Sequence, residues 1–386
     1  MNERPVTRVA FVQAALSIGG AERLVQALAE KMSRDRVEPS IVNLYAAGAI
    51  GEQMQAAGWP MTNHLARSRF DPFVGPRLAR AVAHATVAYV IDSPLPMFWM
   101  GGQRRRHARP RLVLGFHSTG RLGDRLQHLL ARRSAIPVAD QLVALTDSHR
   151  RSLSAELRVP EARFRVVGSG VDLSRFDAAM PRAAARRAAG LPEAGTLVGI
   201  VAALRPEKNH ALFLEAAARV AASVPGARFV IAGDGPARDE VARLAQASGL
   251  GERLLVLGAR QDVPMLYRAL DVAVLSSRPV VETLPVTLIE AAACGTPAVA
   301  TAVGSVTDVV VNGETGYVVA PGDAATLAGR IVQLLNDTAA RERMGVAARR
   351  RAVERFDERD MIRRYEDLFV DTARAERAPP VAIDPT

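Results

Sequence analysis

Hydrophobic runs alternate with longer amphipathic segments along most of the chain. Apolar runs such as RVAFV at 8–12, RLVLGF at 111–116 and LVGIVA at 197–202 each precede a segment of helical periodicity. In those segments apolar residues recur at intervals of three and four, as Leu24 and Leu28 do. Buried strands that alternate with amphipathic helices are typical of parallel sheets covered by helices on both faces. The pattern therefore predicts an α/β fold.

The same pattern sets the expected bounds of six strands and of the helix after each one. The strands are expected at 8–12, 111–116, 141–145, 197–202, 228–233 and 271–277. The helices are expected at 21–32, 122–133, 148–157, 211–222, 237–247 and 286–293.

The length of 386 residues, of which 49% are hydrophobic, is enough for two cores. Single cores stop growing at about 250 to 300 residues, so two domains are expected. The segment Asp177–Thr196 is rich in Ala, Arg, Gly and Pro and interrupts the pattern, which places the junction there. The predicted domains are therefore 1–180 and 191–355, both Rossmann-like. A charged amphipathic helix at 356–373 is expected to pack back across the junction, and 374–386 to be a disordered tail.

The net charge of +10 lies in the first half of the chain. Residues 1–165 carry 24 Lys and Arg against 13 Asp and Glu, whereas residues 166–386 carry 26 against 27. The segment 101–165 alone holds 14 basic and 5 acidic side chains. It is either a solvated arginine-rich surface or a face that binds an anion, such as a membrane of anionic phospholipid or a pyrophosphate-linked substrate. With 5% aromatic residues and no groove-reading motif, nucleic acid is not expected as a partner.

Neither a signal peptide nor a transmembrane helix is expected, because the longest apolar stretches stop short of the ~18 to 20 residues that span a bilayer. Cys294 is the only cysteine, which fits a reducing compartment. The sequence therefore predicts a cytoplasmic protein, peripheral on the inner face of the cell membrane if the basic segment binds lipid.

Two loops at strand ends combine glycine or cationic residues with a helix start. Gly19 and Gly20 open the helix after the first strand, where free amides favour an anion, although the G-x-G-x-x-G spacing is absent. Arg205 and Lys208 follow the strand at 197–202, where two cations suit a pyrophosphate. His117 also ends a strand. Each has a structural alternative: a plain turn, ordinary loop charges, or a structural histidine.

Two glutamates flank the start of the helix at 286–293. Pro285 fixes the chain at that start, so Glu282 lies in the preceding loop and Glu290 about one turn inside the helix. The amides of Thr287 and Leu288 lie between them. This arrangement offers two carboxylates for sugar hydroxyls around a patch of anion-binding amides.

These motifs, in their order, resemble the retaining glycosyltransferases of family 4. The resemblance rests on GGAERLVQALA, VVGSGVDLSRF, LRPEKNHALFLEA, FVIAGDGPARDEVARLA, LLVLGARQDVPMLYRALDVAVLSS, ETLPVTLIEAAACGTPAVAT and NGETGYVVAPGDAATLA, which together span nearly the whole chain. It implies a GT-B fold, in which two Rossmann-like domains with parallel sheets face a central cleft. It also implies an acceptor, a glycan or a lipid-linked molecule, held by the first domain, and a UDP-, GDP- or ADP-sugar held by the second.

The resemblance further implies the roles of single residues, without a metal or a cofactor. Arg205 and Lys208 bind the donor pyrophosphate, Glu282 contacts the transferred sugar and Glu290 the ribose, and His117 orients the reacting sugar. In addition, Gly19 and Gly20 are implied to pack against the donor phosphates and Leu257, in the VLGAR segment, to lie by the base. The remaining donor contacts implied are Thr283, Leu284, Pro285, Thr287 and Leu288.

This chain departs from the family pattern at two places. Thr283 and Leu284 stand where Gly and Phe are common, which leaves the sugar open, and Ser169 stands where Asn is common. The expected activity is sugar transfer with retained anomeric configuration in the synthesis of cell-envelope polysaccharide, exopolysaccharide or glycolipid. A nucleotide-sugar epimerase of the same fold and a non-catalytic nucleotide-sugar binding protein are the alternatives, of which the second would have lost some of the four charged residues.

Overall fold

The chain forms two α/β units, as the hydrophobic pattern predicts. The structure, a computed structural model, describes residues 5–17, 19–68, 71–117, 125–279 and 282–376. Unit 1 consists of Met1–Ser169 with Arg359–Thr386, and unit 2 of Gly170–Glu358. The predicted tail at 374–386 lies mostly outside the described residues.

The junction precedes the predicted one, because the segment Asp177–Thr196 belongs to unit 2. Its helix α7 (Arg182–Ala189) packs against helix α10 (Val263–Ala269). Arg186 of α7 is buried and donates to the carboxylate of Asp271 at 2.6 Å, which also accepts from the amide of Leu197 at 2.8 Å. The arginine-rich composition thus marks a helix tied to the sheet of unit 2 by a buried ion pair.

Unit 1 contains a seven-stranded sheet of order β3-β2-β1-β4-β5-β6-β7, in which every recorded pairing is parallel. Its strands are β1 (Thr7–Gln13), β2 (Val37–Asn43), β3 (Met61–Thr62), β4 (Val87–Ile91), β5 (Arg111–Gly115), β6 (Gln141–Ala144) and β7 (Phe164–Val166). The chain order reverses direction between β1 and β4, and ligands of such sheets bind at the carboxyl ends of the strands beside that point.

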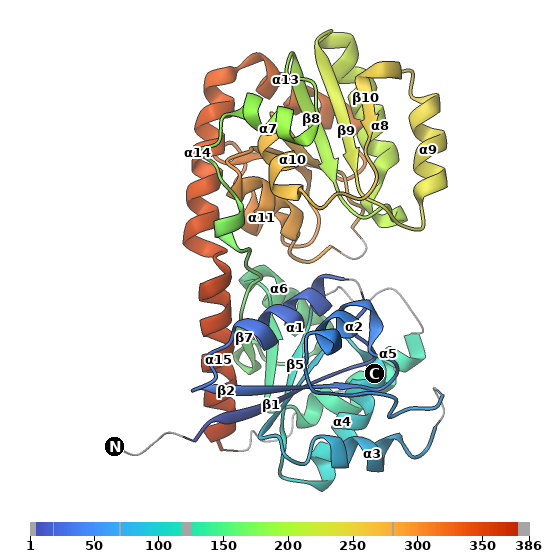
Figure 1. Ribbon diagram of the computed structural model, residues 1–386, viewed down its shortest axis with the longest axis vertical. Helices are drawn as coiled ribbons and strands as arrows, with labels where there is room; N and C mark the ends of the chain where they lie inside the picture. The colour runs from blue at the N-terminus through green and yellow to red at the C-terminus, as the bar shows by residue number, and fades with distance from the viewer. Residues whose placement is uncertain (1–4, 18, 69–70, 118–124, 280–281, 377–386) are drawn as a thin grey trace. The chain divides into compact units, whose positions relative to one another are not determined.

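Helices cover both faces of this sheet (Figure 1). One face buries apolar side chains of α3 (Val74–Ala81), α4 (Pro94–Arg106), α5 (Arg125–Ala135) and α6 (Asp147–Leu157). The other buries those of α1 (Gly20–Lys31), α2 (Gly48–Ala56) and α15 (Glu358–Arg374). Strand residues alternate between the two clusters, as the pleat requires.

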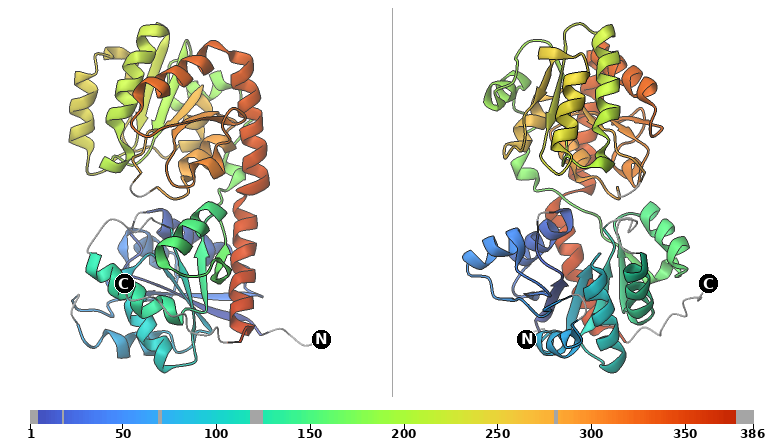
Figure 2. Two further views of the ribbon diagram at one scale, coloured as in Figure 1. Left: turned by 180° about the vertical axis from the view of Figure 1, so that it is seen from behind. Right: turned by 90° about the vertical axis from the view of Figure 1, so that its right-hand side faces the viewer.

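Helix α15 is the predicted charged amphipathic helix, and it belongs to the core of unit 1. Figure 2 shows it lying along the first sheet. Tyr365 and Phe369 are fully buried, and the ring of Phe369 meets that of Tyr89 edge to face at 5.3 Å. The neighbouring Glu366, also buried, accepts from Arg36 at 2.9 Å. The last helix of the chain therefore completes the domain that the first strand begins.

Unit 2 contains a six-stranded parallel sheet of order β10-β9-β8-β11-β12-β13. Its strands are β8 (Thr196–Val201), β9 (Ala227–Ala232), β10 (Leu254–Val256), β11 (Val272–Leu275), β12 (Ala298–Thr301) and β13 (Gly316–Val319). Here the order reverses between β8 and β11, so the loops after these two strands flank the expected ligand site.

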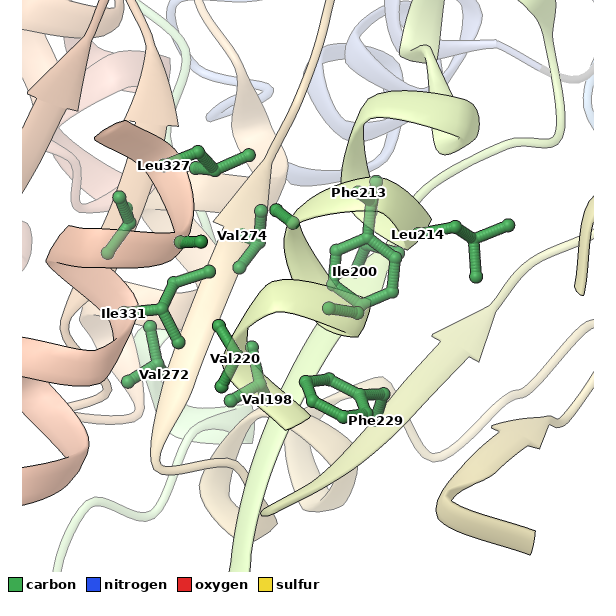
Figure 3. Close-up of a cluster of buried hydrophobic side chains, with 14 of the residues drawn as sticks. Val198, Ile200, Phe213, Leu214, Val220, Phe229, Val272, Val274, Leu327 and Ile331 are labelled. Atoms are coloured by element: carbon green, nitrogen blue, oxygen red, sulfur yellow. The ribbon is translucent and has the colours of Figure 1, made fainter. Parts of the chain in front are cut away.

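One face of this sheet packs on α8 (His210–Ser223), α9 (Arg238–Ala247) and α13 (Ala324–Asn336), whose apolar side chains interleave with those of the strands (Figure 3). Phe213 and Phe229 are among the largest side chains there. The elements α10 and α11 (Val286–Ala293) contact each other, and α11 also contacts β11, β12 and α14 (Thr338–Arg355). Helix α11 has the bounds that the sequence predicts. A short helix, α12 (Val306–Val309), follows β12.

Within the described residues, no helix combines the length and the apolar character that crossing a bilayer requires.

Candidate active site

Two predicted residues meet where the strand order of unit 2 reverses. Lys208 ends the short 3-10 turn at Pro206–Lys208 after β8, and Glu282 lies in the loop after β11. Lys208 Nζ lies 2.6 Å from Glu282 Oε2, and their side chains are only 18% and 10% exposed. Ser277 Oγ donates to the same carboxylate oxygen at 2.8 Å. The structure thus brings a cation, a hydroxyl and a carboxylate together at the carboxyl edge of the sheet.

Hydroxyl groups hold these two loops in place. Ser276 Oγ donates to the carbonyls of Lys208 at 2.9 Å and Asn209 at 3.1 Å, which joins the loop after β11 to the loop after β8. Thr301 Oγ1, at the end of β12, donates to the Ser277 carbonyl at 2.8 Å. Ser276, Ser277 and Thr301 are all buried, so the positions of Lys208 and Glu282 depend on interior contacts.

Glycines let two further loops approach this site closely. Gly304 has a φ of +52°, and a Cβ there would collide with the carbonyl of Glu282. The next amide, of Ser305, donates to Thr283 O at 2.6 Å. Gly233, with a φ of +149°, lies directly against the carbonyl of Ala202 at the end of β8. The tight turn at 233–235, the GDG turn, therefore packs against the loop that carries Lys208.

Arg205 lies apart from the ion pair. Its side chain is exposed, and among the described residues no hydrogen bond or ion pair joins it to Glu282. Instead it lines a small cavity of about 60 Å³ together with His210, Glu240 and Arg278. The amide of Arg278 donates to the carbonyl of Glu207 at 2.8 Å, which places this second arginine beside the same loop. Arg278 was not among the site residues predicted from the sequence.

Glu290 lies one turn inside α11, as predicted, beside the buried phenol of Tyr267 on α10. Burial raises the pKa of Tyr267 well above its usual value, and the nearby Glu290 carboxylate raises it further. Tyr267 Oη in turn donates to Val201 O, the last residue of β8, at 3.4 Å. Glu290 therefore stands next to the strand that leads to Lys208.

The start of α11 differs from the prediction in one respect. The amide of Leu288 already donates to the carbonyl of Pro285 at 3.0 Å, so it is not available to an anion. The side chains of Thr283, Leu284 and Leu288 are buried. Any phosphate contact at this helix start would have to come from the amides that precede Leu288, such as that of Thr287.

Leu257 follows β10 and is held by the end of the neighbouring strand. Its amide donates to Ile231 O at 2.9 Å, and the carbonyl of Gly258 accepts from the amide of Gly233 at 2.8 Å. The VLGAR segment thus borders the GDG turn at the carboxyl edge of the sheet. Its contact with a nucleotide base stays a prediction.

His117 stands in a hydrogen-bonded group within unit 1. The hydroxyls of Tyr89 and Tyr365 lie 3.3 and 3.4 Å from His117 Nε2 and 3.2 Å from each other. The His117 amide donates to Asp92 Oδ2 at 2.5 Å. Burial lowers the pKa of His117 to about 3, with a further contribution from nearby His149. The imidazole is therefore neutral at physiological pH.

Gly19 and Gly20 lie at the start of α1, as predicted, with Gly19 as the N-cap in an extended conformation. The carboxylate of Glu22, in the first turn, lies so close that it would touch a Cβ on Gly19. A negative charge there opposes an approaching phosphate. The proposed contact of these glycines with the donor phosphates gains no support from the geometry.

Across the part of the chain that the structure covers, no group of three or more His, Cys, Asp or Glu side chains is arranged to hold a metal ion.

Two protein families match this chain. Residues 18–175 match Glycosyltransferase Family 4, and residues 181–351 match Glycosyl transferases group 1. A D-inositol 3-phosphate glycosyltransferase from Thermobispora bispora is 30% identical over 313 residues, which are 74% of this chain and 72% of the relative. An N-acetyl-alpha-D-glucosaminyl L-malate synthase from Bacillus anthracis is 29% identical over 188 residues, 49% of each chain.

The chain spans less than two thirds of the length of several other curated relatives, for example 63% of the D-inositol 3-phosphate glycosyltransferase from Salinispora arenicola. Among solved structures, the Anabaena protein HepE in complex with UDP superposes with a TM-score of 0.81 at 21% identity, over 94% of this chain and 99% of HepE. Together with the two parallel-sheet units, these matches show that the chain has the GT-B fold and belongs to glycosyltransferase family 4, the glycosyl transferases of group 1.

Proposed function

We propose that the protein transfers a sugar from a nucleotide-sugar donor to a hydroxyl group of a glycan or lipid-linked acceptor, with retention of the anomeric configuration. The observation that carries the proposal is the cluster of Lys208, Glu282 and Ser277 at the point of unit 2 where the strand order reverses. Ligands of doubly wound sheets bind at this point, and the cluster offers them a cation beside a carboxylate.

Lys208 supplies positive charge for the departing pyrophosphate. As the glycosidic bond breaks, negative charge grows on the leaving phosphate, and a preorganised cation stabilises that charge without reorganisation. Arg205 and Arg278, which line one cavity beside the same loop, extend the cationic surface. These three side chains do in this proposal what a divalent metal does in other phosphate sites, so transfer should continue in the presence of EDTA.

Glu282 holds the transferred sugar. Both recorded hydrogen bonds of its carboxylate reach Oε2, and among the described residues none reaches Oε1. Oε1 can therefore accept a hydrogen bond from a sugar hydroxyl while Lys208 and Ser277 hold the carboxylate in orientation. The carboxylate of Glu290 is assigned to the ribose hydroxyls.

His117 orients the reacting sugar through a neutral imidazole. The hydroxyls of Tyr89 and Tyr365 lie within hydrogen-bond distance of Nε2 and hold the ring in place after the end of β5. In the transfer, the bond between the anomeric carbon and the phosphate oxygen breaks, the acceptor oxygen bonds to that carbon on the same face, and the acceptor proton passes to the leaving phosphate.

We propose UDP-sugars as the first donors to test, because HepE has been crystallised with UDP and with UDP-glucose. The curated relatives named for inositol phosphate and malate indicate small polar acceptors as a second class beside glycans and lipid-linked molecules. A role in the synthesis of envelope polysaccharide or glycolipid is part of the same proposal.

A thermal-shift panel of UDP, GDP and ADP and their sugars tests donor binding. A ligand at 100 times its dissociation constant stabilises a protein by about 2.7 kcal/mol, which such an assay detects. Glu282→Gln should keep the shift caused by the nucleoside diphosphate and lose part of the shift caused by its sugar. Arg243→Gln, an exposed change on α9, serves as the control.

Proton NMR of fresh product with the active donor then tests the reaction. A product with the donor's anomeric configuration is expected. An inverted linkage would refute retention, and isomerisation of the donor without an acceptor would show an epimerase. If no nucleotide or nucleotide sugar stabilised the protein, the site itself would be wrongly assigned.

A further inference from the structure

Helices α3, α4 and α5 form an arginine-rich surface on one side of unit 1. They carry eight arginines and no aspartate or glutamate. In Figure 1 they lie next to one another in cyan and teal, and α4 contacts both of the others. Arg104, Arg77 and Arg132 are paired with Asp140, Asp71 and Glu156. Arg105, Arg106 and Arg133 are exposed, as is Arg80, and within the described residues no ion pair with a carboxylate is recorded for Arg80, Arg105 or Arg106.

Large apolar side chains are exposed on the same surface. Phe98 of α4 is 38% exposed, and Leu129 and Leu130 of α5 are 44% and 46% exposed. Phe73, at the start of α3, is 62% exposed. Only a few other large apolar residues in the described part of the chain reach this exposure, and they are scattered over both units. Exposed apolar side chains gathered on adjacent helices mark an interaction surface.

A groove of about 450 Å³ between α4 and α5 combines both features. It is lined by Phe98, Trp99 and Leu130 on the apolar side and by Arg105, Arg106 and Arg133 on the basic side, and no carboxylate contributes. Gly101 lets the helices approach closely, because a Cβ there would lie 2.5 Å from the Ser134 carbonyl. Ser134 Oγ donates to Phe98 O at 2.8 Å, so the groove has a fixed shape.

We propose that this surface, the α4–α5 patch, docks unit 1 on a membrane that contains anionic phospholipid. Exposed aromatic and aliphatic side chains interleaved with arginines suit the interface of a bilayer, where apolar groups enter the acyl boundary and cations meet phosphate headgroups. A nucleic acid would use the arginines and leave Phe98 and Leu130 in water. The inference is independent of the sugar-transfer proposal, since it requires only binding to lipid.

The position of the patch is compatible with catalysis in unit 1. It covers the outer side of α4 and α5, whereas His117 follows the carboxyl end of β5. The arginines at the end of α4 lie towards the amino ends of the strands, because α4 returns the chain from the carboxyl end of β4 to the start of β5. Docking through the patch therefore leaves the carboxyl edge of the sheet uncovered.

Sedimentation of the full chain with vesicles tests the proposal at low and physiological salt. Vesicles of phosphatidylcholine with 30% phosphatidylglycerol should bind the protein at least about tenfold better than phosphatidylcholine alone. Each basic residue near such a surface changes binding about fivefold, so the double change Arg105→Gln and Arg106→Gln should weaken binding roughly 25-fold. The double change Arg243→Gln and Arg343→Gln, on exposed helices of unit 2, removes the same charge and should have little effect.

The apolar part of the patch needs a separate variant. Phe98→Ser with Leu130→Ser should weaken binding to anionic vesicles while leaving the net charge unchanged. In a Trp59→Phe background, Trp99 is the only tryptophan, and brominated lipid should quench its fluorescence if the groove enters the bilayer.

The proposal is wrong if neutral and anionic vesicles bind alike, or if the two arginine pairs have the same effect. If the serine variant binds as well as the parent, and brominated lipid leaves Trp99 unquenched, the patch is a general polyanion site and docking by insertion is refuted.

Discussion

The Lys208–Glu282 ion pair allows a test that requires no knowledge of the substrates. The changes are Glu282→Gln, Lys208→Met and the double variant. Glutamine keeps the shape of the side chain and an oxygen for Ser277, so it removes mainly the charge. With the side chains 10% and 18% exposed, each single change leaves one charge mostly buried without its partner.

The expected magnitude follows from the contacts. A hydrogen bond to a charged group contributes about 1.5 to 3 kcal/mol; Lys208→Met removes the bond between Lys208 and Glu282, and Glu282→Gln removes the carboxylate charge from it. We expect each single variant to lower the stability of unit 2 by about 2 kcal/mol. The double variant should cost less than the sum of the two, with a coupling energy of roughly 1 to 2 kcal/mol, because no buried charge is then left without a partner.

The chain contains a separate reporter for each unit. Both tryptophans, Trp59 and Trp99, lie in unit 1, and the single cysteine, Cys294, lies in unit 2. Cys294 is fully buried, its Sγ donates to Pro264 O at 3.3 Å, and burial raises the pKa of its thiol to about 12. In urea, labelling of Cys294 therefore reports the unfolding of unit 2, while tryptophan fluorescence reports that of unit 1.

In all three variants, the curve of Cys294 labelling against urea concentration should shift to lower urea. The variants should leave the fluorescence curve in place if the units unfold independently, and shift both together if they do not. Additive effects of the two single changes, or a labelling curve that none of them moves, would refute the inference that the pair is coupled and partly buried in solution.

Glu290, two histidines and two glycines give three further predictions. Glu290→Ala should raise the KM for the donor about tenfold or more with little change in kcat, because ribose contacts are equal in ground and transition states; steady-state kinetics showing the reverse would contradict this. Burial lowers the pKa of His117 to about 3 and that of His210 to about 4, so the unfolded chain binds protons first as the pH falls below 6.5. The contribution of these two histidines to the free energy of unfolding should be complete above that pH. Below it, the free energy of unfolding should fall by up to about 1.4 kcal/mol per pH unit for each histidine, which urea unfolding at pH 7 and at pH 5 would measure. Equal urea midpoints at the two pH values would contradict this. Gly233→Ala should destabilise unit 2 by about 1 to 3 kcal/mol, whereas Gly329→Ala, in a helix with open space around it, should stabilise it by about 0.5 to 1 kcal/mol; a labelling curve that does not separate the two would contradict the turn geometry.

In unit 2 the three strands and three helices predicted from the sequence lie close to those observed, because each carries a strong local pattern, whereas β10, β12 and β13 were not predicted. Helix α11 begins and ends at the predicted residues, and α8 and α9 differ from prediction by one residue at most at each end. The junction was misplaced for a physical reason. A segment rich in Ala, Arg, Gly and Pro is compositionally similar to a linker, and only the buried contact between Arg186 and Asp271 shows that it is a folded helix.

The predicted site residues differ in how far their contacts could be expected from the sequence. Lys208 and Glu282 are 74 positions apart, and their loops follow strands whose adjacency, β8 beside β11, is a rule of doubly wound sheets. Their meeting could therefore be expected. Arg205, by contrast, makes no recorded contact with Glu282 among the described residues. The direction of its side chain depends on a turn of a few backbone residues, which no periodic pattern encodes.

The two tyrosines that contact His117 were not predicted as site residues, because their sequence pattern is that of core residues. Tyr89 stands in the middle of a buried strand and Tyr365 on the apolar side of the last helix, 276 positions away, yet their hydroxyls meet at His117. Gly115 makes this meeting possible, since a Cβ on it would occupy the place of the Tyr89 hydroxyl. A hydroxyl at the end of an apolar ring is invisible to hydrophobic periodicity, and its function arises only when the partner from the far end of the chain is in place. Helix α15 therefore places a hydroxyl group beside His117 as well as covering the sheet of unit 1.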